Sequence, residues 1–532
     1  MTNADLLVAM LREAGVRYAF GIPSGQVLRL IEAMRTGGIE YVLVAHEATA
    51  GFMAGVVGRL TGTPGVCLST LGPGATNLAT GVGDAFLDRS PVVAITGNVP
   101  LPQVGRRIQM HIDHHALFRP ITKATYLLMP GRVAKTIRDA LTIALTEPPG
   151  PVHLDLCEDV AEEVARERPL PLKPAGVLRE VPLEDILRVR ELLSQAHRPV
   201  AVIGNSAYRA RAREPLLRFV EAQQLPFATT TMAKGLLPDD HPLAIGCIER
   251  ARRQLQRQFL RQADLVLGLG YDPVEVEYEA WIGRTPLVHV DIEPADADES
   301  VRLVHQVVGD LLFSFSRLAG LEPIAHEWPA DAVLKHMESF QKALRPPGDG
   351  FAPHRALDIL REEFPREGIL AFDVGAHTHQ IASQWTAYEP DTFLITNGWS
   401  SMGFGVPAAL AAKLVRRERP VVCVVGDGCF QMTAGEMATA RRLGLPIPFI
   451  VLNDRWLSLI RVKQAKRHLG IYGTELLRES NPPPAHHFGV PCVGARDAEG
   501  FRKALREALA APGPTVIEAD VDARQYMETV YD

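Results

Sequence analysis

The chain has 532 residues and a formal net charge of −6, with 47% hydrophobic and 22% charged residues. This length exceeds what one hydrophobic core usually supports and indicates about three domains. The composition contains no basic run suited to a polyanion, which argues against a nucleic-acid-binding protein.

Six cysteines are scattered along the chain without a Cys-x-x-Cys pair, so the spacing predicts neither a disulfide framework nor a zinc motif. No apolar run approaches the roughly 20 residues that span a bilayer. The N-terminal helical pattern carries charges where a signal peptide would have an apolar core. We therefore expect a cytoplasmic protein with no membrane partner.

Short apolar runs alternate with amphipathic helical patterns along the whole chain. Residues 91–96, 263–270 and 446–454 are examples, and this alternation is typical of parallel sheets covered by helices on both faces. Two stretches rich in Pro, Arg and Glu interrupt it at residues 166–182 and 345–354. We therefore predict an α/β fold with three doubly wound parallel-sheet domains. Their predicted ranges are residues 1–165, 183–322 and 350–532.

The central segment contains the sequence GLGYDP at residues 268–273, directly after a predicted strand. A dinucleotide-binding turn needs a third glycine for close helix packing, and Pro273 stands at that position. We therefore interpret Gly268 and Gly270 as a tight strand end and not as a dinucleotide site.

Two polar residues follow apolar runs in the last segment. Asp427 comes directly after PVVCVVG, which is typical of a strand buried on both faces. Asn453 ends the run FIVLN, and the 24 residues between Gly428 and Asn453 leave room for one helix and the next strand. Because consecutive parallel strands end at one edge of a sheet, we expect Asp427 and Asn453 to converge.

This pair of side chains predicts a diphosphate-metal site. A carboxylate and an amide oxygen suit Mg²⁺, which takes phosphate oxygens at other positions. Gly426 and Gly428 would let the backbone approach a phosphate, and a helix starting near Thr433 would direct its N-terminus toward it. The alternative is that Asp427 only caps a helix and Asn453 belongs to a turn. The two features together favour the metal site.

At these residues the chain resembles the thiamine diphosphate (ThDP) enzymes, whose signature is Gly-Asp-Gly followed further on by Asn. Residues 42–97 resemble the pyrimidine-binding domain of acetolactate synthase-like members, while residues 372–380, 395–410 and 426–439 resemble their diphosphate-binding domain. GYDPVEVEYEAW, at residues 270–281, is similar to the flavin-free catabolic acetolactate synthases. The resemblance implies pyrimidine-binding, central and diphosphate-binding domains, with ThDP and Mg²⁺ as cofactors and no FAD.

The resemblance also implies which residues hold the cofactor. Asp427, Asn453 and the carbonyl of Arg455 would bind Mg²⁺, and Met402 would wedge ThDP into a bent shape. Ala376 stands where acetolactate synthases usually have a glutamine, so we expect one bond to the diphosphate to be absent or to be supplied by His379. The residues expected to bind ThDP are Gly375, His377, Ser400, Met402, Gly426, Asp427, Gly428, Cys429, Asn453 and Leu457.

Glu47 lies in the apolar sequence YVLVAHEATAGFMAG. If Glu47 is buried, its carboxylate requires a hydrogen-bond partner or a raised pKa. The alternative is that Glu47 is an exposed glutamate that caps a helix at the end of a strand. The resemblance implies that Glu47 donates to the aminopyrimidine ring of ThDP and so helps the cofactor to lose its reactive proton. It further implies a homodimer or homotetramer with shared active sites, in which Glu47 of one chain serves ThDP held by another.

Three more residues are candidates for catalysis. Gln109 falls in a family loop that faces the substrate. His114 and His115 are unusual for acetolactate synthases, whereas several 2-oxo acid decarboxylases use adjacent histidines for proton transfer. A surface or capping role for both histidines is an equal alternative.

We expect decarboxylation of a small 2-oxo acid, with pyruvate favoured, followed by carboligation as in acetolactate synthases. Lys463 occupies a position that is often tryptophan in the biosynthetic members, which argues against their preference for 2-oxobutyrate. The first alternative is a simple 2-oxo acid decarboxylase that releases an aldehyde. The second is a non-catalytic cofactor-binding regulatory protein, and intact Glu47, Asp427 and Asn453 argue against it.

Overall fold

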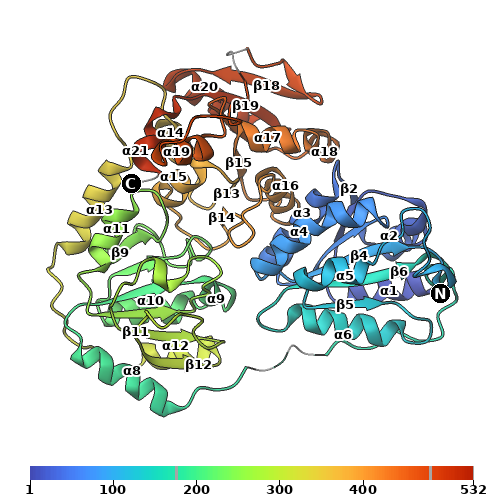
Figure 1. The fold of residues 1–532 in the computed structure, drawn as a ribbon, viewed down its shortest axis with the longest axis horizontal. Helices are drawn as coiled ribbons and strands as arrows, with labels where there is room; N and C mark the ends of the chain where they lie inside the picture. Colours follow the sequence, from blue (N-terminus) through green and yellow to red (C-terminus); the bar gives the residue numbers. More distant parts are fainter. Residues whose placement is uncertain (174–175, 177, 478–481, 531–532) are drawn as a thin grey trace.

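The computed structural model describes residues 1–173, 176, 178–477 and 482–530. Three sheets occupy successive parts of the chain, and helices lie on both sides of each (Figure 1). The predicted linker at 166–182 includes residues 174, 175 and 177, which lie outside the described set. Within the described set, no helix combines the length and the hydrophobicity needed to cross a bilayer.

The first sheet has the strand order β2-β1-β3-β4-β6-β5, and all its pairs are parallel. Its strands are β1 (Tyr18–Gly21), β2 (Glu40–Leu43), β3 (Gly65–Ser69), β4 (Val92–Asn98), β5 (Ala124–Leu127) and β6 (Pro151–Cys157). Its helices are α1 (Asn3–Glu13), η1 (Gly25–Val27), α2 (Leu28–Gly37), α3 (Glu47–Thr61), α4 (Pro73–Leu87), η2 (Leu101–Gln103), α5 (His114–Phe118), η3 (Arg119–Ile121), α6 (Val133–Leu145) and α7 (Glu158–Glu162). Every residue of β3, β4 and β6 is buried, which explains their unbroken apolar sequences.

The second sheet has the order β12-β11-β10-β7-β8-β9 and is also parallel. Its strands are β7 (Pro199–Ile203), β8 (Phe227–Thr229), β9 (Ala244–Cys247), β10 (Leu265–Leu269), β11 (Leu287–Asp291) and β12 (Leu303–Val308). The accompanying helices are α8 (Leu183–Gln195), α9 (Asn205–Arg209), α10 (Arg213–Ala222), α11 (Arg253–Leu260), η4 (Tyr278–Ala280) and α12 (Leu311–Ala319), and α13 (Ala332–Ala343) leads to the last domain. Gly270 has φ +62° and packs on the backbone of Ala207, so the glycine does end a strand tightly.

The third sheet has the order β14-β13-β15-β16-β19-β18-β17. Its strands are β13 (Ile369–Phe372), β14 (Phe393–Leu394), β15 (Val421–Gly426), β16 (Pro448–Asn453), β17 (His486–His487), β18 (Val490–Ala495) and β19 (Thr515–Asp520). Its helices are α14 (Pro353–Glu363), α15 (Ala376–Gln384), α16 (Gly405–Val415), α17 (Asp427–Thr433), α18 (Glu436–Leu443), α19 (Ser458–Lys466), α20 (Ala498–Ala510), η5 (Ala523–Gln525) and α21 (Tyr526–Thr529). The predicted fold class is confirmed, and among the described strands only the short edge strand β17 pairs in the antiparallel sense.

The first and third domains share one hydrophobic core. Helix α3, which also packs on α4, contacts α16 in the middle of the molecule (Figure 1), and buried residues from both domains form a single cluster there. The rings of Phe52 and Phe404 pack edge to face with centroids 5.8 Å apart. Arg59 on α3 also donates a hydrogen bond to the carbonyl of Ile395. This packing places the start of α3 beside α18, where the backbone N–H of Ala45 donates to the Glu436 carboxylate.

Candidate cofactor and active site

Asp427 and Asn453 follow neighbouring parallel strands, as their spacing predicts. Gly426 at the end of β15 is in register with Leu452 on β16, so the next residue of each chain segment leaves the same edge of the sheet. The two oxygens of the buried Asp427 accept the backbone N–H groups of Gly428 and Arg455, at 2.8 and 2.7 Å. The buried Oδ1 of Asn453 has no hydrogen-bond partner among the described residues.

The electrostatics of this edge favour a bound cation. Burial, reinforced by the nearby carboxylate of Asp454, raises the pKa of Asp427 to about 7. Burial likewise raises the pKa of Asp454 to about 6. A divalent cation would lower the pKa of both carboxyl groups again, and the unpartnered Asn453 oxygen would be one of its ligands. The carbonyl of Arg455 accepts the N–H groups of Leu476 and Leu477, at 2.8 and 3.4 Å, so a metal at this oxygen would compete with the longer of the two bonds.

A cavity of about 240 Å³ opens at this edge of the third sheet. It is lined by every residue predicted to bind ThDP except Asn453, and its further lining residues are Val374, Ala376, Leu452, Asp454, Trp456, Ser458, Leu459, Ile460 and Tyr526. Helices α15 and α19 begin in its wall, so backbone N–H groups are available to an anionic group. The cavity therefore suits a ligand that has an anionic end.

Two glycines keep the wall of this cavity open. A Cβ atom at Gly426 would lie 3.0 Å from the ring of His377, and one at Gly428 would lie 2.9 Å from Leu457 and 3.3 Å from Met402. Burial lowers the pKa of His377 to about 3, so its imidazole is neutral, and its Nε2 has no partner among the described residues. A side chain at either glycine would push His377, Leu457 or Met402 into the space of the ligand.

Asp373 holds the loop that carries Met402, a role that the sequence reasoning missed. Its fully buried carboxylate accepts the N–H groups of Val374, Gly403 and Gly405. These bonds fasten the end of β13 to the loop before α16. The sequence AFDV could have indicated this, because it places an aspartate at the end of a buried strand as VVGD does for Asp427.

Glu47 begins α3 and is buried in the first domain. Its Oε2 accepts a hydrogen bond from Asn77 at 3.0 Å. Its Oε1 faces Gly74, where a Cβ atom would lie 3.3 Å away. All residues that line the cavity of the third domain lie between Val374 and Tyr526, so Glu47 of the same chain is not among them.

His114 belongs to a buried polar network under the turn at Gly72. The Nε2 of His114 accepts the N–H of Gly72 at 3.2 Å, so Nδ1 carries the ring proton and lies 3.0 Å from Asp155. Thr96 and Asn98 donate to the same carboxylate, each at 2.7 Å. Burial alone would raise the pKa of Asp155, but hydrogen bonds from His114 and Thr96 bring it below its ordinary value.

His115 and Gln109 lie differently from His114. His115 is one-third exposed and its Nδ1 pairs with the hydroxyl of Thr125 at 2.9 Å. Gln109 is in an exposed turn. Both ring nitrogens of His114 therefore have partners, whereas His115 and Gln109 reach solvent in the single chain.

A second cavity, of about 690 Å³, adjoins the first between the central and third domains. The two cavities share the lining residues Val374, Gly375, Ser400 and Leu459. Lys463 lines the second cavity, as do Glu249 and His379, which pair at 2.8 Å. His379 thus lies in the wall of the second cavity, and the bond that it was expected to supply in place of a glutamine at position 376 stays a prediction.

Three family models match the chain along most of its length. They are described as Thiamine pyrophosphate enzyme, N-terminal TPP binding domain (residues 1–117), central domain (residues 186–318) and C-terminal TPP binding domain (residues 373–519). The chain belongs to the thiamine pyrophosphate enzyme family. Thiamine pyrophosphate (TPP) is another name for ThDP. The C-terminal match contains the edge at which Asp427 and Asn453 meet and every lining residue of the cavity described above except Tyr526, so this cavity belongs to a TPP binding domain.

Curated relatives of this ThDP enzyme are acetolactate synthases. It is 31% identical to acetolactate synthase of Bacillus subtilis (strain 168) over 530 residues, which cover 98% of this chain and 93% of that protein. Identity is 30% with the probable acetolactate synthase large subunit of Methanocaldococcus jannaschii, over 100% of this chain and 93% of that protein. Identity is also 30% with acetolactate synthase isozyme 1 large subunit of Escherichia coli (strain K12), over 98% of this chain and 94% of that protein. The chain is therefore an acetolactate synthase-like, ThDP-dependent enzyme.

Proposed function

We propose that this enzyme decarboxylates a small 2-oxo acid, with pyruvate as the favoured donor, and joins the remaining unit to a second 2-oxo acid. The observation that carries the proposal is the cavity at the edge of the third sheet, where every predicted ThDP ligand except Asn453 meets. When bound, ThDP would supply a nucleophilic carbon for the keto group and a thiazolium ring that accepts the electron pair left behind when CO₂ departs. The chain's own residues bind the cofactor, orient it and handle protons.

Mg²⁺ would be held by Asp427, Asn453 and the carbonyl of Arg455. The unpartnered Oδ1 of Asn453 and the raised pKa of Asp427 support this assignment, because both point to a missing positive charge. The glycine-lined wall and the N-termini of α15 and α19 would receive the diphosphate. Carboxylate and amide oxygens favour Mg²⁺ over softer metals at this position.

Glu47 would hold a proton at Oε1 for the pyrimidine end of the cofactor. Asn77 occupies Oε2 and keeps the side chain oriented, so Oε1 is the oxygen available to a ligand. A homodimer or homotetramer with shared active sites is part of the proposal, because all residues that line the cavity come from the last domain. A second copy of the chain would bring its Glu47 to the open side of that cavity.

Carboligation is favoured over simple decarboxylation on one observation. A decarboxylase of the kind that uses adjacent histidines needs a histidine that can give a proton to the substrate carbon. His114 has partners at both ring nitrogens and is almost fully buried, which leaves only His115 for that task. Glu47 is buried and hydrogen-bonded to Asn77, which argues against a non-catalytic regulatory protein.

The test is to incubate the purified protein with ThDP, Mg²⁺ and a panel of 2-oxo acids and to identify the products by mass spectrometry. We expect a 2-hydroxy-2-methyl-3-oxo acid from pyruvate alone. ThDP binding is measured in parallel by calorimetry on the wild type, Asp427→Ala and Asp497→Asn. The last variant is the control, because Asp497 is the N-cap residue of α20 and does not line the cofactor cavity. Aldehyde as nearly the only product would reject carboligation, and undiminished ThDP affinity in Asp427→Ala would reject the metal assignment.

A further inference from the structure

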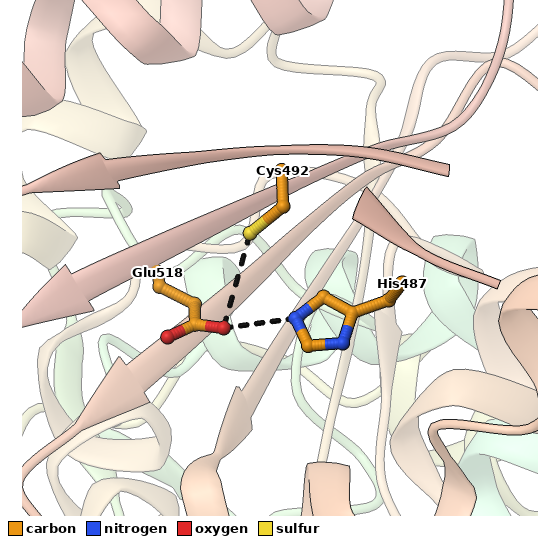
Figure 2. Close-up of side chains that lie close together, drawn as sticks. All are labelled: His487, Cys492 and Glu518. Carbon is orange, nitrogen blue, oxygen red and sulfur yellow. Dashed lines mark hydrogen bonds and ion pairs between the residues drawn. The ribbon is translucent and has the colours of Figure 1, made fainter. Parts of the chain in front are cut away.

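Three potential metal ligands meet at the outer edge of the third sheet, away from the residues that line the cofactor cavity. His487 lies on β17, Cys492 on β18 and Glu518 on β19, and Figure 2 shows their side chains turned toward one another. The Nε2 of His487 is 2.9 Å from Oε1 of Glu518, and Sγ of Cys492 is 3.8 Å from the same oxygen. One ligand atom from each residue lies within 4.8 Å of the other two.

The pairing of the strands explains why these residues meet. Cys492 is opposite Val516 on the parallel strand β19, and Glu518 follows Val516 by two residues, so Cys492 and Glu518 are diagonal neighbours on one face. The antiparallel pairing of His487 with Val490 folds β17 back beside them. The ring of Phe430 packs edge to face against His487 with centroids 4.9 Å apart and supports the imidazole from α17. The backbone therefore holds three donors from three strands in one place.

The donor set selects a class of metal. A thiolate, an imidazole and a carboxylate together suit Zn²⁺, whereas Mg²⁺ and Ca²⁺ prefer oxygen ligands alone. Zinc–ligand distances of about 2.0–2.3 Å place tetrahedral donors roughly 3.3–3.8 Å apart. The Sγ–Oε1 separation of 3.8 Å lies in this range, and the Nε2–Oε1 separation of 2.9 Å would widen slightly on binding. The side chains of His487 and Glu518 are 20% and 16% exposed, so the ion would be shielded but reachable.

We propose that His487, Cys492 and Glu518 form a Zn²⁺ site, with water as the fourth ligand. On binding, the Cys492 thiol releases its proton to solvent, and the proton between Nε2 of His487 and Oε1 of Glu518 leaves Nε2, so that the neutral imidazole carries its proton on Nδ1 and Nε2 binds the metal. The site fastens the two-residue strand β17 to the body of the sheet. None of its three ligands lines the cofactor cavity, so the two sites are separate.

The experiment uses the full-length holoenzyme, with excess ThDP and Mg²⁺ present so that Zn²⁺ does not enter the cofactor site. After exposure to Zn²⁺ and dialysis, bound zinc is measured by elemental mass spectrometry. We expect one zinc per chain in the wild type and affinity at least about 100-fold weaker in Cys492→Ser and His487→Gln. His486→Gln is the matched control, because this exposed neighbour on the same strand lies on the opposite face and should leave binding unchanged.

A second measurement on the wild type does not depend on how the variants fold. Among the chain's cysteines Cys492 alone is partly exposed, so Zn²⁺ should slow its alkylation at least about tenfold, read by peptide mass spectrometry. Wild-type protein that retains no zinc after dialysis would overturn the proposal. Equal zinc content in the wild type and Cys492→Ser, or alkylation of Cys492 unaffected by Zn²⁺, would show that the three side chains form only a hydrogen-bonded group.

Discussion

The backbone N–H of Gly72 donates a hydrogen bond to Nε2 of the buried His114. Gly72 has φ +59°, and a Cβ atom there would meet the carbonyl of Met110 at 2.3 Å, so the turn tolerates no other residue. Two residues later Gly74 packs against Oε1 of Glu47. Asp155 and His114 thus control the position of the turn that confines Glu47.

His114→Ala is expected to lower kcat about 10- to 100-fold, because a displaced Gly72 turn would misplace Glu47. KM for pyruvate should change much less, and the ratio of aldehyde to ligation product should stay the same. Steady-state kinetics with product analysis test this, with His115→Ala as the matched control. A strong shift toward ligation in His114→Ala would instead identify His114 as a proton donor to the substrate.

Glu47→Gln and Asp427→Ala should each inactivate the enzyme for different reasons. The first variant should still bind ThDP, and the second should not. If active sites are shared, equal mixing with free exchange makes half of the dimers mixed, each with one intact site, and should restore about a quarter of wild-type activity. Absence of recovery in mixtures shown by native mass spectrometry to contain mixed dimers would count against a shared site.

Glu275 should make stability depend on pH. Burial raises its pKa from 4.5 to about 8, and its Oε1 accepts the N–H of Met232. The folded protein therefore binds one proton more than the unfolded chain between these values, so its stability falls as pH rises from about 4.5 to about 8. Denaturant midpoints between pH 5 and 8.5 should fall more steeply for the wild type than for Glu275→Gln. The exposed Glu277→Gln should follow the wild type, and equal slopes in all three would disprove the assignment.

The purified enzyme should contain no stoichiometric FAD. Pro273 prevents a glycine-rich dinucleotide turn after β10, and GYDPVEVEYEAW is similar to flavin-free synthases. The measurement is the visible absorbance of the purified protein, together with flavin release on denaturation. One equivalent of FAD per chain would contradict this prediction.

The convergence of Asp427 and Asn453 could be predicted because each follows an unbroken apolar run, and parallel strands end at a common edge. Asp155 could not be predicted in the same way. It lies inside β6, where HLDLC has an ordinary strand pattern, and its partners His114 and Thr96 are 41 and 59 residues away in the sequence. The hydrophobic periodicity of a strand indicates which of its faces is buried. It does not indicate which side chain, distant in the sequence, will donate a hydrogen bond to a buried carboxylate.

The placement of Gln109 shows a different limit. The resemblance assigns it to the substrate, and the single chain leaves it on an exposed turn, so its role stays a prediction. The hydrophobic pattern of a sequence does not show which residues contact a second subunit. The His487, Cys492 and Glu518 group is similar, because only the pairing of three strands brings its members together.

The core shared by α3 and α16 has a consequence for how the protein is made. The apolar face of α3 is synthesised about 340 residues before α16, its packing partner. At ordinary rates of translation, that face would wait roughly 20 to 70 s before it can be covered. During this interval the side of α3 that carries Phe52 lacks its partner Phe404, so we expect the nascent chain to be most prone to aggregation while the central domain is being translated.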